Sequence, residues 1–196
     1  MSHRKFGPEE IDEFLHLLDS ELTRPVTVTL IGGAAIGLLY DPKHATTDVD
    51  FLPVIDAEFW GAVERARGRM AERLPVQCAG VYSAPYEYED RRRSLELAQA
   101  RFLTVLVPEQ HDLALMKVAR GLEHDLEALE DVHARTPFDL ETLIERYYDT
   151  RTQVIGPEVA LTLSFLSLVD RLFGAELATK VEERLERCTP PPVKSV

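Results

Sequence analysis

The sequence of 196 residues has few of the residues that cross-link small secreted domains or bind zinc. It contains only two cysteines, Cys78 and Cys188, which lie far apart, and it has no Cys-x-x-Cys pair. This distribution argues against a disulfide framework and against a cysteine-rich zinc site. It fits a protein of a reducing compartment, and we therefore expect a cytoplasmic location.

Long apolar runs are also missing. The first residues are polar and basic and lead into an amphipathic segment, unlike the apolar core of a signal peptide. The most apolar stretch, residues 159–173, is too short to span a bilayer and is interrupted by polar side chains. We therefore expect a soluble protein without a membrane partner.

Positive charge is scarce, with 22 Lys and Arg against 34 Asp and Glu and a formal net charge of -12. Such a balance disfavours broad, non-specific binding of nucleic acid. It leaves open a polyanion held by a local basic patch, or a basic protein partner. The only dense basic cluster is Arg91-Arg92-Arg93. It either balances the neighbouring acids at positions 87, 89 and 90 or contacts a substrate anion or RNA.

Hydrophobic periodicity and the positions of Pro and Gly predict a mixed α/β front half and an all-helical back half. The expected strands are residues 26–31, 48–54, 76–82 and 102–107. The expected helices are residues 8–24, 34–39, 56–73, 109–120, 121–135, 138–149, 157–173 and 175–188, and residues 85–97 fit neither pattern. The predicted class is α+β: a small mixed sheet flanked by helices in residues 1–108, a helical subdomain in 109–188, and a flexible, proline-rich tail in 189–196.

The chemistry in this pattern begins where the strand at 26–31 ends on Gly32-Gly33. Glycines at such a point let backbone N–H groups approach a phosphate closely. After the spacer, Asp48 and Asp50 stand at positions i and i+2 of the next strand, so both carboxylates face the same side and could share one divalent cation. Ligands that are all oxygen favour Mg²⁺ or Mn²⁺ over Zn²⁺.

Each half of this pattern also has an ordinary structural explanation. The glycines alone would fit a tight turn, and the two acids alone would fit a solvated edge strand. Together and in this order, they predict a site for phosphoryl or nucleotidyl transfer, in which the metal balances triphosphate charge and the glycine turn orients the phosphates.

The run from Gly32-Gly33 to Asp48-Val49-Asp50-Phe51 resembles the signature of the DNA-polymerase-β-like nucleotidyltransferase superfamily. The residues Thr46-Thr47 before the acids are most similar to the branch that contains toxin nucleotidyltransferases of abortive-infection and toxin–antitoxin systems. A second stretch, from Asp112 through Lys117 to Arg120 and then Asp125, resembles a later motif of that branch. The resemblance covers roughly residues 26–132 and implies a nucleotidyltransferase fold for the core.

The resemblance implies a role for each matching residue. Metal binding and catalysis fall to Asp48 and Asp50, contact with the nucleotide phosphates to Gly32, Gly33, Lys117 and Arg120, and acid–base assistance or the holding of Lys117 to Asp125. It also places a third carboxylate on a following strand. Residues 76–82 contain none, and the nearest acids are Glu87, Glu89, Asp90 and Glu96.

The two residues of the later motif have simpler explanations when they are taken alone. Lys117 sits beside apolar neighbours, as a surface lysine at the edge of a core often does. Asp125 belongs to an acidic run that could be a solvated helix face. The sequence leaves these alternatives open.

The leading hypothesis is a metal-dependent nucleotidyltransferase that transfers a nucleoside monophosphate from a nucleoside triphosphate to an acceptor. By resemblance the acceptor could be tRNA or a protein, with a cognate antitoxin as partner, or a small molecule as in aminoglycoside-modifying relatives. A competing hypothesis is a degenerate member of the fold that binds nucleotide or a partner protein without turnover. A third is a helical interaction protein whose front half is incidental.

Overall fold

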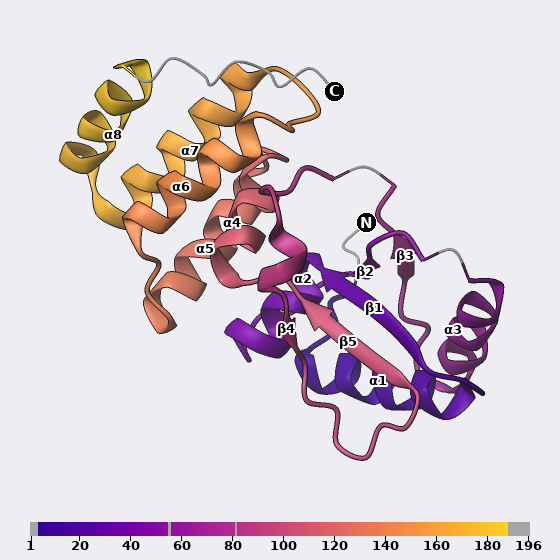
Figure 1. Ribbon diagram of the computed structural model, residues 1–196. Helices are drawn as coiled ribbons and strands as arrows, with labels where there is room; N and C mark the ends of the chain where they lie inside the picture. Colours follow the sequence, from indigo (N-terminus) through magenta and orange to yellow (C-terminus); the bar gives the residue numbers. More distant parts are fainter. Residues whose placement is uncertain (1–3, 55, 81, 188–196) are drawn as a thin grey trace, which may run out of the picture. The chain divides into compact units, whose positions relative to one another are not determined.

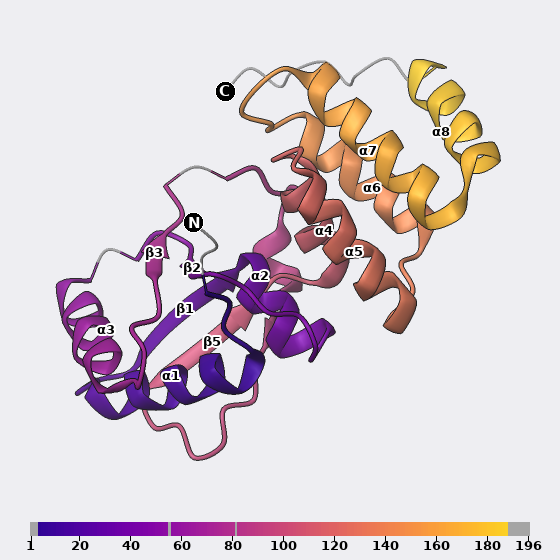
Figure 2. The ribbon, with the colours of Figure 1, turned by 180° about the vertical axis from the view of Figure 1, so that it is seen from behind.

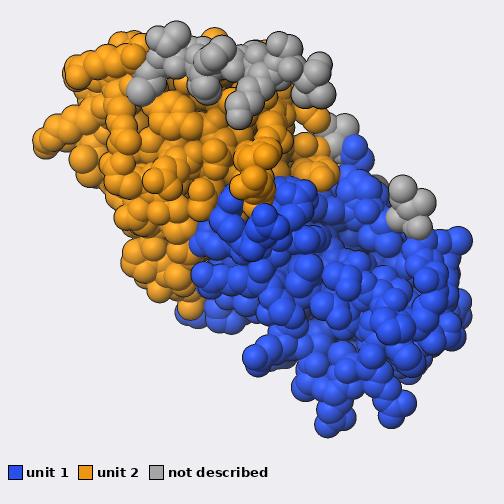
Figure 3. All heavy atoms as spheres, in the orientation of Figure 1, with its two compact units in different colours: residues 1–81, 88–109 blue, residues 82–87, 110–196 orange. Residues whose placement is uncertain are grey.

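The computed structural model describes residues 4–54, 56–80 and 82–187 and confirms the expected α+β class (Figure 1). The chain divides into two compact units (Figure 3). Unit 1 consists of residues 1–81 and 88–109, and unit 2 consists of residues 82–87 and 110–196. The predicted tail at 189–196, together with Cys188, lies outside the described residues.

Unit 1 is built on a five-stranded mixed sheet with the order β3-β2-β1-β5-β4. The strands are β1 (Val26–Ile31), β2 (Val49–Phe51), β3 (Val76–Cys78), β4 (Arg93–Ser94) and β5 (Leu103–Val107). β1 runs parallel to β5 and antiparallel to β2, while β3 is parallel to β2 and β4 antiparallel to β5. β2 and β3 are shorter than predicted. The unassigned segment at 85–97 contains β4 and the 3₁₀ turn η2 (Tyr88–Arg91).

One face of this sheet is apolar and covered by helices. In Figure 2, α1 (Pro8–Glu21) lies in front of β1 and β5. Phe51 of β2 meets Phe59 of α3 (Ala57–Arg69) edge to face, with the ring centroids 5.5 Å apart. Along each strand, the residues next to the buried ones point to the opposite face of the sheet. On that face Thr27 of β1 is paired with Thr104 of β5, and both are exposed. The sheet therefore has one face for the core and one polar face.

A short helix follows β1 directly. Gly32–Ala35 forms one turn of α-helix (α2), and Ile36–Tyr40 continues as a π-helix (η1). This confirms the predicted buried helix at 34–39 and moves its start back to Gly32. π-helical turns are rare and often occur near functional sites.

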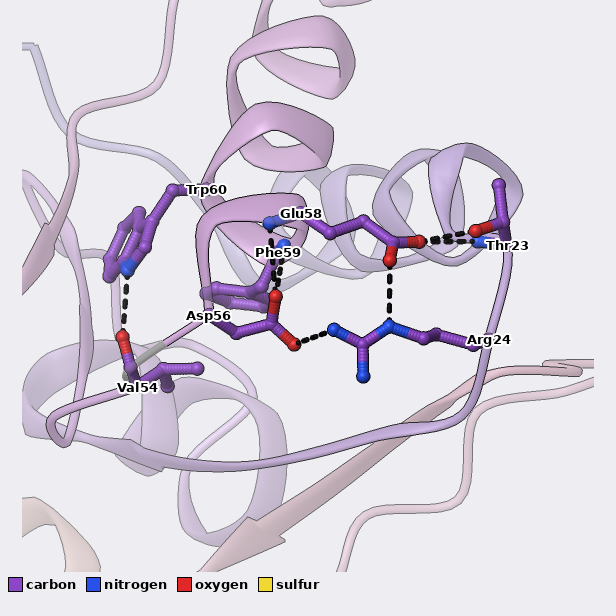
Figure 4. A network of polar contacts seen from close by, with 7 residues as sticks. All are labelled: Thr23, Arg24, Val54, Asp56, Glu58, Phe59 and Trp60. Atoms are coloured by element: carbon purple, nitrogen blue, oxygen red, sulfur yellow. Dashed lines mark hydrogen bonds and ion pairs between the residues drawn. The ribbon is translucent and has the colours of Figure 1, made fainter.

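The start of α3 is fixed by a polar network that Figure 4 shows. Asp56 caps the helix by accepting hydrogen bonds from the backbone N–H groups of Glu58 (2.9 Å) and Phe59 (3.4 Å). Arg24, just before β1, pairs with Asp56 at 2.8 Å and with Glu58 at 2.7 Å. Hydrogen bonds from Thr23 and Arg24 lower the pKa of Glu58 to about 2, so this carboxylate stays ionised and ties α3 to β1.

Unit 2 is helical, with α4 (Gln110–Val118), α5 (Glu123–Arg135), α6 (Leu140–Arg151), α7 (Glu158–Phe173) and α8 (Ala175–Arg187). All nine residues of α4 are buried, including the charged Asp112 and Lys117. A helix buried on every side needs partners for its polar groups, and α4 has neighbours in α5, α6 and α7. Of the helices among the described residues, none is both long and apolar enough to cross a membrane.

Candidate functional site

The glycine turn and the carboxylate strand meet directly in unit 1. Ile31, the last residue of β1, lies opposite Asp50 of β2. The next residue, Gly32, has φ +72°, and a Cβ at this position would stand only 2.9 Å from Asp50 Oδ2. The left-handed backbone favours glycine, and a side chain here would push against the Asp50 carboxylate. The glycine turn and the acid-bearing strand, which are separate in the sequence, therefore lie next to each other in the structure.

Gly33 is enclosed by the loop that leads to β2. A Cβ on Gly33 would lie 2.5 Å from Thr46 Oγ1 and 3.1 Å from His44 Nε2. Thr46 is itself held by two backbone hydrogen bonds to Phe6, of 2.7 and 3.0 Å, and its hydroxyl reaches Asp48 Oδ1 at 3.4 Å. The spacer between glycines and acids is thus folded back against the glycines it follows.

Asp48 and Asp50 share the polar face of the sheet, as their spacing predicted. Both are partly exposed. The Gln77 side chain connects them, because its Nε2 donates hydrogen bonds to Asp50 Oδ1 at 2.8 Å and to Asp48 Oδ2 at 3.2 Å. Gln77 lies on β3 in direct register with Asp50. Three oxygen-bearing side chains therefore converge: Asp50 from β2, Gln77 from β3, and Asp48 from the residue just before β2.

This donor set fits a hard divalent cation, with two carboxylates as charged ligands. Rotation of the Gln77 amide would present its carbonyl oxygen in place of the nitrogen. Among the residues that the structure describes, no group of three or more His, Cys, Asp or Glu side chains is placed to hold a metal. Gln77 lies on β3, the following strand, where the resemblance led us to expect a third acid. The sequence pattern did not single out Gln77, because its side chain is an amide and the resemblance points to a carboxylate.

The residues of the second motif cluster within unit 2. Lys117 Nζ lies 2.5 Å from Asp125 Oδ1. Arg120 binds both oxygens of the same carboxylate through Nη2 at 2.8 Å, with Nε at 3.0 Å from Oδ2. Burial would raise the pKa of Asp125, but the charges and hydrogen bonds of Lys117 and Arg120 outweigh it and the pKa is lowered. Asp125 is therefore an ionised, firmly held anion.

The burial of this cluster excludes the simpler explanations. Lys117 is 5% exposed and Asp125 is fully buried, so neither is a solvated surface charge. The Arg120 side chain is 49% exposed and remains accessible while it is paired. Gly32, Gly33, Asp48 and Asp50 lie in unit 1, whereas Lys117, Arg120 and Asp125 lie in unit 2.

A glycine turn packed against two strand carboxylates, on a small mixed sheet followed by helices, defines a nucleotidyltransferase-like domain. Residues 9–164 match the protein family described as "Nucleotidyltransferase of unknown function (DUF6036)". The chain therefore belongs to this family. Comparison with curated proteins and with solved structures finds no match.

Proposed function

We propose that the protein is a metal-dependent nucleotidyltransferase that transfers a nucleoside monophosphate from a nucleoside triphosphate to an acceptor and releases pyrophosphate. The observation that carries the proposal is the 2.9 Å approach between the Cβ position of Gly32 and Asp50, which unites the glycine turn and the acid pair. The family, described as a nucleotidyltransferase, supports the same class of reaction.

In this proposal Asp48 and Asp50 hold Mg²⁺ or Mn²⁺, with Gln77 as a neutral companion. The bound ion would offset triphosphate charge and favour loss of the acceptor's hydroxyl proton. Gly32 and Gly33 carry no side chains, so their backbone N–H groups are the groups that would meet the nucleotide phosphates. Asp50 is held in register by the sheet, and Gln77 connects it to Asp48 just before β2, so the carboxylates need little rearrangement on binding.

The resemblance is the basis for proposing that Lys117 and Arg120 contact nucleotide phosphates. Asp125 touches both cations, and its lowered pKa makes it a poor proton acceptor near neutral pH. We therefore assign Asp125 as a positioning residue that holds Lys117 and Arg120, in preference to a role in acid–base chemistry.

The acceptor and the partner follow only from the resemblance to toxin nucleotidyltransferases. On that basis we propose tRNA or a protein as acceptor and a cognate antitoxin as partner, with a small molecule as the third option. The second candidate function is a degenerate domain that binds nucleotide without turnover. The amide of Gln77, which stands where a third carboxylate would add charge, is the observation that favours it.

Transfer of radioactive label from α-labelled nucleoside triphosphates tests the proposal, with Mg²⁺ or Mn²⁺ and separate tRNA, protein and aminoglycoside acceptors. We expect transfer by the native protein and by the Glu13→Gln variant, which changes an exposed acid of α1. We expect none from a variant with both Asp48→Asn and Asp50→Asn. Label transfer that survives the double substitution would overturn the assigned site. Calorimetric binding of nucleotide without transfer to any acceptor would favour the degenerate domain.

A further inference from the structure

Arg92 reaches across the polar face of the sheet in unit 1. It precedes β4, and its Nη1 donates a hydrogen bond to Thr29 Oγ1 of β1 at 2.8 Å. Its Nε donates to the backbone oxygen of Glu89 at 2.9 Å. Both acceptors are neutral. The guanidinium is thus fixed in position while its Nη2 group makes no hydrogen bond with any described residue.

The charge of Arg92 is not balanced by a carboxylate among the residues that the structure describes. Six other arginines of unit 1 do have such partners: Arg4, Arg24, Arg65, Arg67, Arg69 and Arg73. Arg93 and Arg101 form no such ion pair with a described residue, but unlike Arg92 they are exposed. In a chain with net charge -12, acidic partners are plentiful. A partly buried, oriented arginine whose hydrogen-bond acceptors are both neutral points to an anion that comes from outside the chain.

The position of Arg92 relates it to the acid pair. Thr29 and Ile31 point to the same face of β1, about 7 Å apart along the strand. Ile31 lies opposite Asp50, so Arg92 and Asp50 share one face of the sheet. Arg93, the next residue, pairs with Val107, whose side chain belongs to the buried, helix-covered face. Of these two neighbouring arginines, only Arg92 faces the candidate site.

We propose that Arg92 binds the terminal (β and γ) phosphates of the nucleoside triphosphate. The reacting α-phosphate would lie nearer to the metal-binding carboxylates. A guanidinium has five N–H donors in a fixed fork that matches two phosphate oxygens, and Arg92 uses only part of this fork within the chain. This inference rests on the proposed function, because it takes the nucleotide to lie at Gly32 and Asp50.

Calorimetry in Mg²⁺ with inorganic tripolyphosphate, ATP and AMP tests the inference without an acceptor. We expect Arg92→Gln to weaken tripolyphosphate and ATP binding by about 10-fold to 100-fold, as loss of a charged hydrogen bond does. AMP, which lacks the terminal phosphates, should bind both proteins equally. The matched control Arg93→Gln removes the same charge from the opposite face and should bind all three ligands like the native protein.

Two further variants distinguish a specific loss of phosphate binding from a general folding defect. Arg92→Lys keeps the charge but loses the fork, and should bind tripolyphosphate with intermediate affinity. Thr29→Val removes only the hydroxyl that orients Arg92, and should weaken binding by roughly 2-fold to 5-fold. If Arg92→Gln and Thr29→Val bind tripolyphosphate as the native protein does, while Asp48→Asn with Asp50→Asn abolishes binding, the role of Arg92 is wrong and the proposed function stands. If the native protein binds neither tripolyphosphate nor ATP, both proposals fail.

Discussion

At the scale of single residues, Gln77 is the neutral member of a candidate metal site whose other two side chains, Asp48 and Asp50, are acids. Its amide donates to Asp48 and Asp50 but contributes no charge of its own. The affinity of an oxygen-ligand site for a divalent cation rises with the number of charged ligands. Two carboxylates and an amide should therefore bind Mn²⁺ or Mg²⁺ more weakly than three carboxylates would.

This reasoning predicts the effect of restoring the third charge. Gln77→Glu changes one amide nitrogen to oxygen at nearly constant shape, and should raise Mn²⁺ affinity by about 10-fold or more, because a third anion is added beside the ion. Titration of Mn²⁺ followed by electron paramagnetic resonance measures the change. Gln153→Glu makes the same substitution at an exposed position of unit 2 and should leave the affinity unchanged. Equal Mn²⁺ affinities of the native protein and Gln77→Glu would show that β3 does not face the ion.

At the scale of elements, Asp19 connects the end of α1 to the start of β5. Its carboxylate is 8% exposed and accepts backbone hydrogen bonds from Leu103 (2.7 Å), Phe102 (2.8 Å) and Arg101 (3.0 and 3.1 Å). Burial would raise the pKa of Asp19, but these three backbone donors outweigh it and lower the pKa. The carboxylate therefore stabilises the folded state in its ionised form.

Asp19→Asn should lower the free energy of unfolding near neutral pH by about 1–3 kcal/mol, because the charged hydrogen bonds are weakened. The folded pKa is below that of the unfolded chain, so the contribution is fully present above the unfolded pKa, about 3.9, and is lost as pH falls through the folded value. The difference between the native protein and the variant should therefore shrink below about pH 4. Urea unfolding at several pH values measures it. The exposed Glu13→Gln on the same helix should show no such difference, and a gap that stays constant down to the acid limit would contradict the role of the charge.

The elements also show which parts of the fold could be predicted from sequence. Segments with strong local signals were found, such as β1 between Pro25 and Gly32 and α3 after its Asp56 cap. β4 was missed because a strand of two residues has almost no periodicity of its own and exists through pairing with β5. The C-terminal end of β3 was predicted at residue 82 but lies at Cys78, because the pairing with β2 sets the length of this strand and ends there.

The candidate site follows the same rule. Asp48 and Asp50 could be chosen from their spacing, because i and i+2 on a strand share a face whatever the strand pairs with. Gln77 and Arg92 reach that face only through the register of β3 with β2 and the path of the chain from η2 to β4. Such long-range arrangements cannot be read from the local sequence around Gln77 or Arg92. The burial of Lys117 within α4 cannot be read from its local sequence either.

At the scale of the whole molecule, the two compact units can be observed separately during unfolding. Trp60 is the only tryptophan and lies in α3 of unit 1, so its fluorescence reports that unit. Far-ultraviolet circular dichroism reports helices, which make up most of unit 2. Each unit has its own buried apolar residues, and units of this kind can unfold as separate cooperative steps.

Asp125→Asn should destabilise unit 2 selectively. The substitution removes the carboxylate charge that lies 2.5 Å from the buried Lys117 Nζ, and removing one partner of a buried ion pair costs about 3–5 kcal/mol. The urea transition followed by circular dichroism should then begin at lower urea, while the transition of Trp60 fluorescence keeps its native midpoint. Asp131→Asn, on an exposed position of the same helix, is the matched control and should alter neither curve. If Asp125→Asn shifts both curves together, the units unfold as one, and the ion pair in unit 2 supports the fold around Asp48 and Asp50 as well.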